Sequence, residues 1–132
     1  MIEEVAISFL HPSVSRSFRI PCSKIWEFLT DTTTWPRWGP SVKAVESGNR
    51  FIKQGTEGRI KTAGGVWLPF IITVYEEGSV WSWKVAGIPA TGHRVEPQED
   101  GLCKLTFEVP LIAAPYAYIC KIALDRITGI LE

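Results

Sequence analysis

The sequence predicts an α+β fold in which a curved antiparallel sheet of roughly seven strands wraps around a long C-terminal helix. Three observations lead to this prediction. Short segments of strand-like composition follow one another about every ten residues from Val42 onward, with glycine-containing turns between them. Two short helical patterns precede these segments, and one wide apolar helical stripe follows them. The 132 residues are expected to form a single domain.

The first strand and the first helix are predicted from two adjacent patterns. Residues 13–20 alternate, with Val14, Phe18 and Ile20 in phase around Arg16, as in a half-buried strand. Pro21 ends this strand. The following stretch CSKIWEFLTD places its apolar residues on one helical stripe of about two turns.

The next stretch, DTTTWPRWGP, predicts a second short helix or turn with one wide aromatic face. Pro36 suits the first turn of this helix and Pro40 ends it. Trp35 and Trp38 are three residues apart and therefore project from the same side. They either line the mouth of a hollow in the fold or lock the short helices to the sheet, and we favour locking.

The strands after residue 42 are expected to direct large aromatic residues into a hollow. In SVWSWKV, the two-residue period places Trp81 and Trp83 on the inward face. The stretch VWLPFIITVY is apolar at both parities, with Trp67 and Tyr75 assigned to the face that meets the hollow. Asp100 and Gly101 form the strongest hairpin signal in the chain.

The last segment, residues 115–131, has a helical period and two adjacent apolar stripes. Other parts of the protein must therefore pack over a wide face of this helix. A curved sheet and one helix are not expected to close fully around several large rings, so an aromatic-lined cavity is predicted between them. The candidate ligand-binding residues are Trp67, Tyr75, Trp81, Trp83, His93, Phe107, Tyr116, Ile119 and Ala123.

His93 is the one weak catalytic candidate. If odd positions face inward in its strand, His93 and Val95 point into the hollow while Arg94 points out. A neutral imidazole there could polarise a carbonyl or move a proton. The alternative is a hydrogen-bonded histidine without a chemical role. No catalytic motif such as GxSxG, HExxH or GxxxxGK[ST] is present in the sequence.

Composition and charge narrow the range of partners. Fourteen basic residues balance fourteen acidic ones, so the basic stripe that nucleic-acid binding requires is not expected. The longest apolar-rich stretch, residues 109–124, is interrupted by Pro110, Pro115 and Lys121, which argues against stable insertion in a membrane. Only two histidines occur, which excludes a histidine-rich metal site, and neither a metal nor a cofactor is predicted.

The cysteines and the N-terminus suggest a cellular location. Cys22, Cys103 and Cys120 lie far apart, without CxxC spacing, and are interpreted as buried thiols of a reducing compartment. Residues 1–12 carry glutamates where a secretion signal needs positive charge, and we take them as a leader that is extended or flexible. A cytoplasmic location is therefore predicted.

Two stretches give the chain a resemblance to a known superfamily. CSKIWEFLTDTTTWPRWGPSV and EDGLCKLTFEV, with the strand order around them, resemble the START-like (SRPBCC) helix-grip superfamily of polyketide cyclase/dehydrase and lipid-transport proteins. The resemblance spans about Val14 to Ile130. It implies a domain that binds or carries a small hydrophobic molecule, such as a lipid, polyketide or quinone, in an internal cavity.

Two alternatives to a carrier remain open at this point. The first is a cyclase/dehydrase-like enzyme in which His93, with Tyr116 or Tyr118, handles protons. The second is a protein-interaction module that uses the two-sided apolar stretch VWLPFIITVY, which would also serve a homodimer. The chain departs from the superfamily pattern in two respects, because the last helix is short and a leader of about a dozen residues precedes the first strand.

Overall fold

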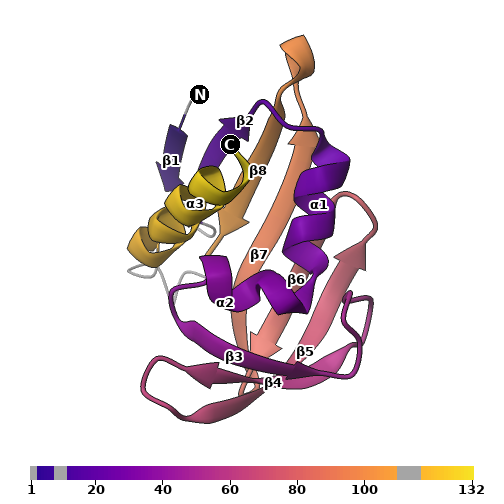
Figure 1. The fold of residues 1–132 in the computed structure, drawn as a ribbon, viewed down its shortest axis with the longest axis vertical. Helices are drawn as coiled ribbons and strands as arrows, with labels where there is room; N and C mark the ends of the chain where they lie inside the picture. Colours follow the sequence, from indigo (N-terminus) through magenta and orange to yellow (C-terminus); the bar gives the residue numbers. More distant parts are fainter. Residues whose placement is uncertain (1–2, 8–11, 110–116) are drawn as a thin grey trace.

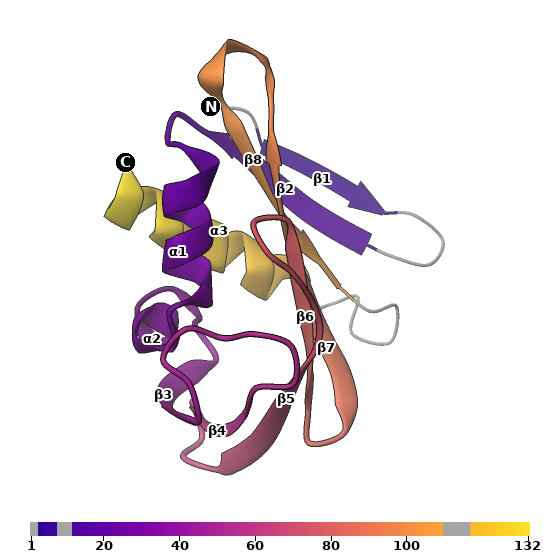
Figure 2. The same ribbon diagram turned by 90° about the vertical axis from the view of Figure 1, so that its right-hand side faces the viewer.

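The computed structural model describes residues 3–7, 12–109 and 117–132, and it places the helices on one side of a single antiparallel sheet (Figures 1 and 2). The strand order is β1-β2-β8-β7-β6-β5-β4-β3. The predicted helix-grip fold is confirmed. The leader adds one strand to the roughly seven expected, because its residues pair with β2 along the edge of the sheet.

The elements follow the predicted order along the chain. The strands are β1 (Glu3–Ile7), β2 (Pro12–Phe18), β3 (Val42–Ser47), β4 (Glu57–Thr62), β5 (Trp67–Glu76), β6 (Val80–Val85), β7 (Ile88–Pro97) and β8 (Cys103–Glu108). The helices are α1 (Cys22–Thr30), α2 (Trp35–Trp38) and α3 (Ala117–Leu131), with short 3₁₀ turns η1 (Thr32–Thr34) and η2 (Glu99–Gly101).

Within the described strands, three irregularities in pairing accompany the curvature of the sheet. They lie at Val42/Ala44 in β3, Ile72/Val74 in β5 and Ser82/Lys84 in β6. A bulge bends its strand and increases the local twist. Figure 2 shows the result, in which β3 and β4 curl toward the side that carries the helices. The sheet therefore has a concave face, and the core lies between that face and the helices.

Helix α3 crosses the concave face and packs against β2 and α2. Its buried residues are Cys120, Ala123, Leu124 and Ile127. Beneath it lies the buried Arg16 of β2, which pairs with Asp125 at 2.6 Å and donates to Thr128 Oγ1 at 3.0 Å. This ion pair ties the helix to the sheet. Within the described ranges, no helix combines the length and the apolarity needed to cross a membrane.

The interpretation of the cysteines as free thiols was wrong for two of the three. Cys22 begins α1 and Cys103 begins β8, and the chain brings their Cα atoms to 5.3 Å, where they form a disulfide. Cys120 is a buried free thiol. The pairing was missed because 81 residues separate the two cysteines in the sequence. The cytoplasmic location stays a prediction, and the cysteines no longer support it.

Candidate ligand-binding site

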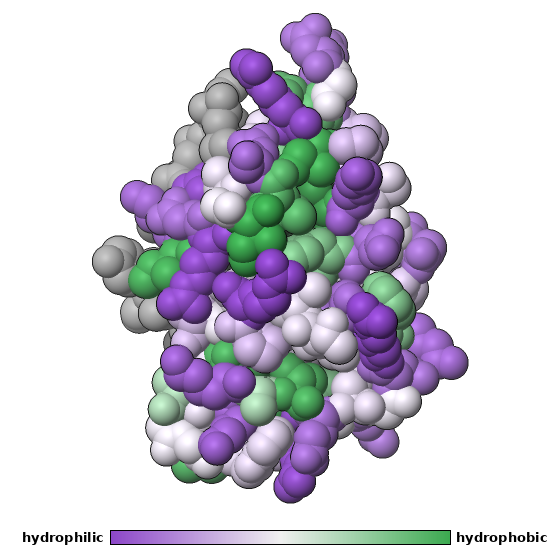
Figure 3. All heavy atoms as spheres, in the orientation of Figure 1, coloured by the Kyte–Doolittle hydropathy of each residue, from purple (hydrophilic) through white to green (hydrophobic). Residues whose placement is uncertain are grey.

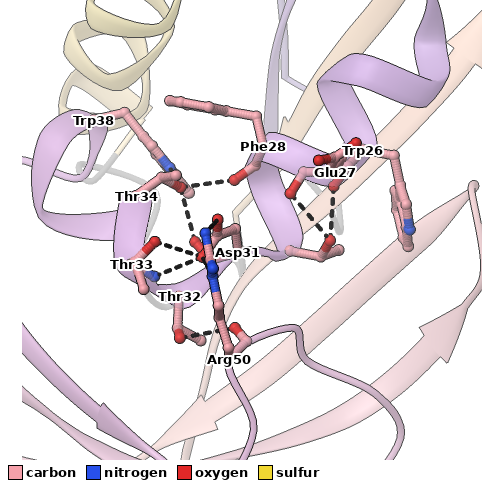
Figure 4. A network of polar contacts seen from close by, with 10 residues as sticks. Trp26, Glu27, Phe28, Asp31, Thr32, Thr33, Thr34, Trp38 and Arg50 are labelled. Carbon is pink, nitrogen blue, oxygen red and sulfur yellow. Dashed lines mark hydrogen bonds and ion pairs between the residues drawn. The ribbon is translucent and has the colours of Figure 1, made fainter.

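The segment between α1 and β3 positions two tryptophans over the sheet, and a polar network fixes its course (Figure 4). The Asp31 carboxylate accepts hydrogen bonds from the Thr33 backbone N–H at 3.0 Å and the Thr33 hydroxyl at 2.6 Å. Arg50 donates to both oxygens of the same carboxylate, from Nε at 3.2 Å and from a terminal nitrogen at 3.0 Å. Asp31 therefore caps η1 and joins it to the chain after β3.

Because of this network, the stability of the protein should depend on the ionisation of Asp31. Burial alone would raise the pKa of Asp31, but the hydrogen bonds from Arg50 and Thr33 outweigh it and hold the pKa below its ordinary value. The stabilisation is thus present above the unfolded-state pKa of about 4 and is lost as the pH falls through the folded-state value. We expect Asp31→Asn to destabilise the protein by about 1–2 kcal/mol at pH 7 and by less at pH 2.5, because asparagine can still cap η1 but loses the charge-assisted hydrogen bonds with Arg50.

Urea unfolding at both pH values would measure this difference. Glu46→Gln is the matched control, because Glu46 pairs with Arg59 on an exposed part of the sheet. An exposed pair of this kind contributes less than about 1 kcal/mol. If Asp31→Asn cost the same at pH 2.5 as at pH 7, the ionised carboxylate would not be the source of the stabilisation.

Trp35 and Trp38 both point into the concave side of the sheet. Trp35 is buried, its Nε1 donates to the Leu29 carbonyl at 2.9 Å, and its ring stacks on Trp81 with centroids 5.4 Å apart. Trp38 Nε1 donates to Thr34 Oγ1 at 3.2 Å, and its ring packs against Phe107. The short helices are therefore locked to the sheet through these rings, as we favoured, and the rings fill much of the concave side.

A chain of hydrogen bonds runs through the buried face of β6 and β7. His93 Nδ1 lies 3.3 Å from the Trp81 carbonyl oxygen, which can only accept, so Nδ1 carries the proton. Nε2 therefore accepts from the Thr91 hydroxyl at 3.1 Å. The oxygen of that hydroxyl accepts in turn from Trp83 Nε1 at 3.1 Å. Burial lowers the pKa of His93 to about 3, against the effect of its bond to the Trp81 carbonyl, so the ring is neutral.

Two hollows on the concave side of the sheet adjoin this chain, and they differ in volume. The first, here called the inner cavity, has a volume of about 40 Å³, enough for a water molecule or the tip of a ligand. It is lined by Trp35, Trp38, Gly39, Pro40, Ser41, Val42, Trp81, Trp83, Thr91, His93, Phe107, Cys120 and Ala123. Its small size follows from the aromatic rings that occupy the concave side.

The second hollow, here called the outer hollow, has a volume of about 300 Å³. It lies over the ends of β4 to β7 and is lined by Ser41, Ile60, Thr62, Leu68, Trp83, Val85, Ile88, Pro89, Ala90 and Thr91. Ser41, Trp83 and Thr91 line both spaces, so the outer hollow adjoins the inner cavity at these three residues. In Figure 3, which shows the helical face, apolar side chains gather between α1 and α3 and in a smaller area over the lower strands.

Five of the nine candidate residues meet at the inner cavity, and the position of His93 agrees with its predicted inward orientation. These five residues are Trp81, Trp83, His93, Phe107 and Ala123. Tyr116 lies outside the described residues, as does the side chain of Ile119.

Trp67 and Tyr75 are the two candidates that the structure places elsewhere. In the β4–β5 register, Lys61 faces Trp67 while Ile60 faces the inward Leu68, so Trp67 lies on the outer face of the sheet. There its ring lies 4.6 Å from the Arg59 guanidinium carbon. The shift in β5 between Ile72 and Val74 reverses the alternation, so Tyr75 does turn inward. It packs against Trp26, away from both hollows.

Sequence reasoning missed Thr91 and the wall of the outer hollow. Thr91 shares the inward parity of His93, and that signal would have identified it. In the all-apolar stretch of β5, the face that carries Trp67 was predicted to point inward, whereas the structure turns the neighbouring Leu68 inward, into the outer hollow. Among the residues that the structure describes, no cluster of three side chains suited to a metal ion is present.

Comparisons with known proteins agree with this architecture. A family model described as polyketide cyclase/dehydrase and lipid transport matches residues 11–116. A search of curated proteins gives no match.

Solved structures with the same fold are distant in sequence. Protein MLL2253 from Mesorhizobium loti is 13% identical over 92% of this chain and 96% of its own, with a TM-score of 0.72. Hypothetical protein jhp0584 from Helicobacter pylori is 12% identical over 89% of this chain and 85% of its own, with a TM-score of 0.71. Protein Ms6760 from Mycobacterium smegmatis is 14% identical over 99% of this chain and 96% of its own, with a TM-score of 0.66. At these identities the likeness concerns the fold alone.

Proposed function

Because this chain belongs to the polyketide cyclase/dehydrase and lipid transport family, we propose that it binds a small, largely apolar molecule in the outer hollow. The observation that carries the proposal is an apolar space of about 300 Å³ that adjoins a polar chain at its inner end. Its walls are mainly aliphatic, with Leu68, Val85 and Ile88 among them. A volume near 300 Å³ matches the lower limit of typical small-molecule sites. A lipid, polyketide or quinone would place one end or one ring system there.

The alternative of a cyclase-like enzyme that uses His93 has less support. Both nitrogens of the His93 ring are engaged, one with the Trp81 carbonyl and the other with the Thr91 hydroxyl. The low pKa of the ring means that it stays neutral throughout the physiological range. We therefore assign His93 a positioning role, in which it orients the Thr91 hydroxyl.

Calorimetric titration with 2-ethylnaphthalene tests the binding proposal. This probe is apolar and small enough for the outer hollow, and we expect a Kd on the order of 10–100 μM. Val85→Trp should fill the hollow from its wall and weaken binding by at least about tenfold, because the new indole takes the place of the ligand. The wild-type titration should also change the fluorescence of Trp83, which lines the hollow.

Val74→Trp is the matched control for this experiment. It makes the same change on the neighbouring strand, where Val74 is exposed and does not line the outer hollow. The control should bind the probe as the wild type does. Equal weakening by both substitutions, or no measurable binding to the wild type, would refute the assignment of the ligand to the outer hollow.

Self-association is a second candidate function that one observation favours. Ile71 and Val74 of β5 are exposed apolar residues in the described part of the chain, and they belong to the stretch suggested for a homodimer or another protein partner. Sedimentation velocity of the wild type and of Ile71→Lys would test this contact. If the wild type and the variant both sediment as monomers, the proposed self-association would be rejected.

A further inference from the structure

One buried hydrogen-bond donor of the inner-cavity wall has no partner among the residues that the structure describes. Trp81 is 1% exposed, and none of these residues offers its Nε1 an acceptor. The three other tryptophans around this cavity are satisfied, since Trp35, Trp38 and Trp83 each donate to an oxygen within 3.2 Å. Leaving a buried donor unpaired costs about 1–3 kcal/mol. A bound acceptor that reached the Nε1 edge of the Trp81 ring would satisfy this donor.

The packing of the Trp81 ring limits where an acceptor can reach it. One face of the ring stacks on Trp35, at an interplanar angle of 7°. His93 also stacks on the ring, with a centroid distance of 3.8 Å. An acceptor for Nε1 must therefore approach in the plane of the ring, at its edge. Trp81 lines the inner cavity and does not line the outer hollow.

The chemistry of the inner cavity favours a neutral acceptor over a charged one. Within the described part of the chain, no Lys, Arg, Asp or Glu side chain lines it. His93 is neutral, and burial raises the pKa of the Cys120 thiol to about 12, so neither residue carries charge at pH 7. A carboxylate placed there would lose its hydration without gaining a counter-charge. A carbonyl oxygen needs only a donor.

We propose that the inner cavity receives the carbonyl end of a neutral ligand, whose oxygen accepts a hydrogen bond from Trp81 Nε1–H. The inference rests on the proposed function, because the body of the ligand lies in the outer hollow. The two spaces share Ser41, Trp83 and Thr91 in their walls, so a ligand whose body lies in the outer hollow would reach the inner cavity past Trp83. A volume of about 40 Å³ suits a carbonyl group and excludes a further ring. The substrate class is thus a ketone, ester or quinone with an apolar body.

A pair of matched probes tests this assignment. 2-Acetylnaphthalene and 2-ethylnaphthalene have similar shapes, and only the first carries a carbonyl. We expect the ratio of their affinities, acetyl over ethyl, to fall by about three- to tenfold in Trp81→Phe, because that variant lacks the N–H donor. The anion 2-naphthoate should bind more weakly than 2-acetylnaphthalene. Tighter binding of the anion would overturn the preference for a neutral group.

Trp26→Phe is the matched control for Trp81→Phe. Trp26 Nε1 is also buried and has no hydrogen-bond partner among the described residues, but Trp26 packs against Tyr75 and lines neither hollow. The affinity ratio should stay at its wild-type value in this variant. A similar fall in both variants would mean that the loss of a tryptophan, and not the loss of this N–H, changes the ratio.

Nuclear magnetic resonance of the wild-type protein gives a second readout that needs no substitution. The indole N–H proton of Trp81 should move downfield with 2-acetylnaphthalene and not with 2-ethylnaphthalene. Binding of the ketone without this shift would overturn the inference. If 2-ethylnaphthalene binds and the ketone has no Trp81-dependent advantage, only the carbonyl assignment fails. If neither probe binds, the outer-hollow proposal fails as well.

Discussion

Trp35→Ala is expected to lower the free energy of unfolding by about 3–5 kcal/mol, the range for deletion of a large buried ring. Trp35 joins the layer of helices to the sheet. It belongs to α2, and its ring contacts Trp81, Trp83 and Phe70 of the sheet. Its removal also leaves the Leu29 carbonyl without the indole N–H. Urea unfolding followed by circular dichroism would measure the change.

Trp67→Ala is the matched control, since it removes the same side chain from the outer face of the sheet. Trp67 is only partly buried and lies against Arg59, so its loss should cost about 1 kcal/mol. The space left by Trp35→Ala should also bind benzene, which would raise the melting temperature of that variant and not of the control. Equal costs for the two substitutions would mean that Trp35 does not join the layers.

Alternation along a strand predicted side-chain direction well where polar residues marked one face. In β7, Arg94 between His93 and Val95 was enough to place the histidine inward, and the structure agrees. In β6, Ser82 and Lys84 marked the outer face in the same way and left Trp81 and Trp83 inside. In such strands the two-residue period fixes which side chains point inward, because polar residues are tolerated only on the outer face of the sheet.

The same reasoning failed in β5, where both parities are apolar. The register shift between Ile72 and Val74 leaves no mark in the sequence, yet it places Trp67 and Tyr75 on opposite faces. A single extra residue reverses every side chain beyond it. The size of the inner cavity was unpredictable for a similar reason, because it depends on how far Trp35 and Trp38 reach into the concave side.

Contacts between distant segments were the least predictable feature. Arg16 shares the parity of Val14 and Phe18 in its strand, and no partner was predicted for it; in the structure it lies under α3 and pairs with Asp125. The hydrogen-bond chain from Trp83 to His93 needs the loop and register of the β6–β7 hairpin, which no local pattern specifies. Neither interaction has a signature in the spacing of the residues that make it.

The second large effect is expected from the Cys22–Cys103 disulfide, whose removal should lower the free energy of unfolding by about 2–5 kcal/mol. The bond closes a loop across 81 residues, which contains α1, α2 and the strands β3 to β7. Reduction releases this constraint on the unfolded chain and so favours unfolding. Urea unfolding with and without dithiothreitol would measure the loss, and Cys22→Ser with Cys103→Ser should reproduce it.

Two controls distinguish the effect of losing the disulfide bond from the effect of changing the cysteine side chains. The double variant should not respond to dithiothreitol, because Cys120 is then its only cysteine. Cys120→Ala should keep the full response of the wild type to the reductant, since that thiol lies at the inner cavity and takes no part in the bond. Titration of denatured, unreduced wild-type protein should find the Cys120 thiol alone. Three titratable thiols, together with stability that reductant leaves unchanged, would show that the loop is not closed and that packing alone holds α1 against the end of β8.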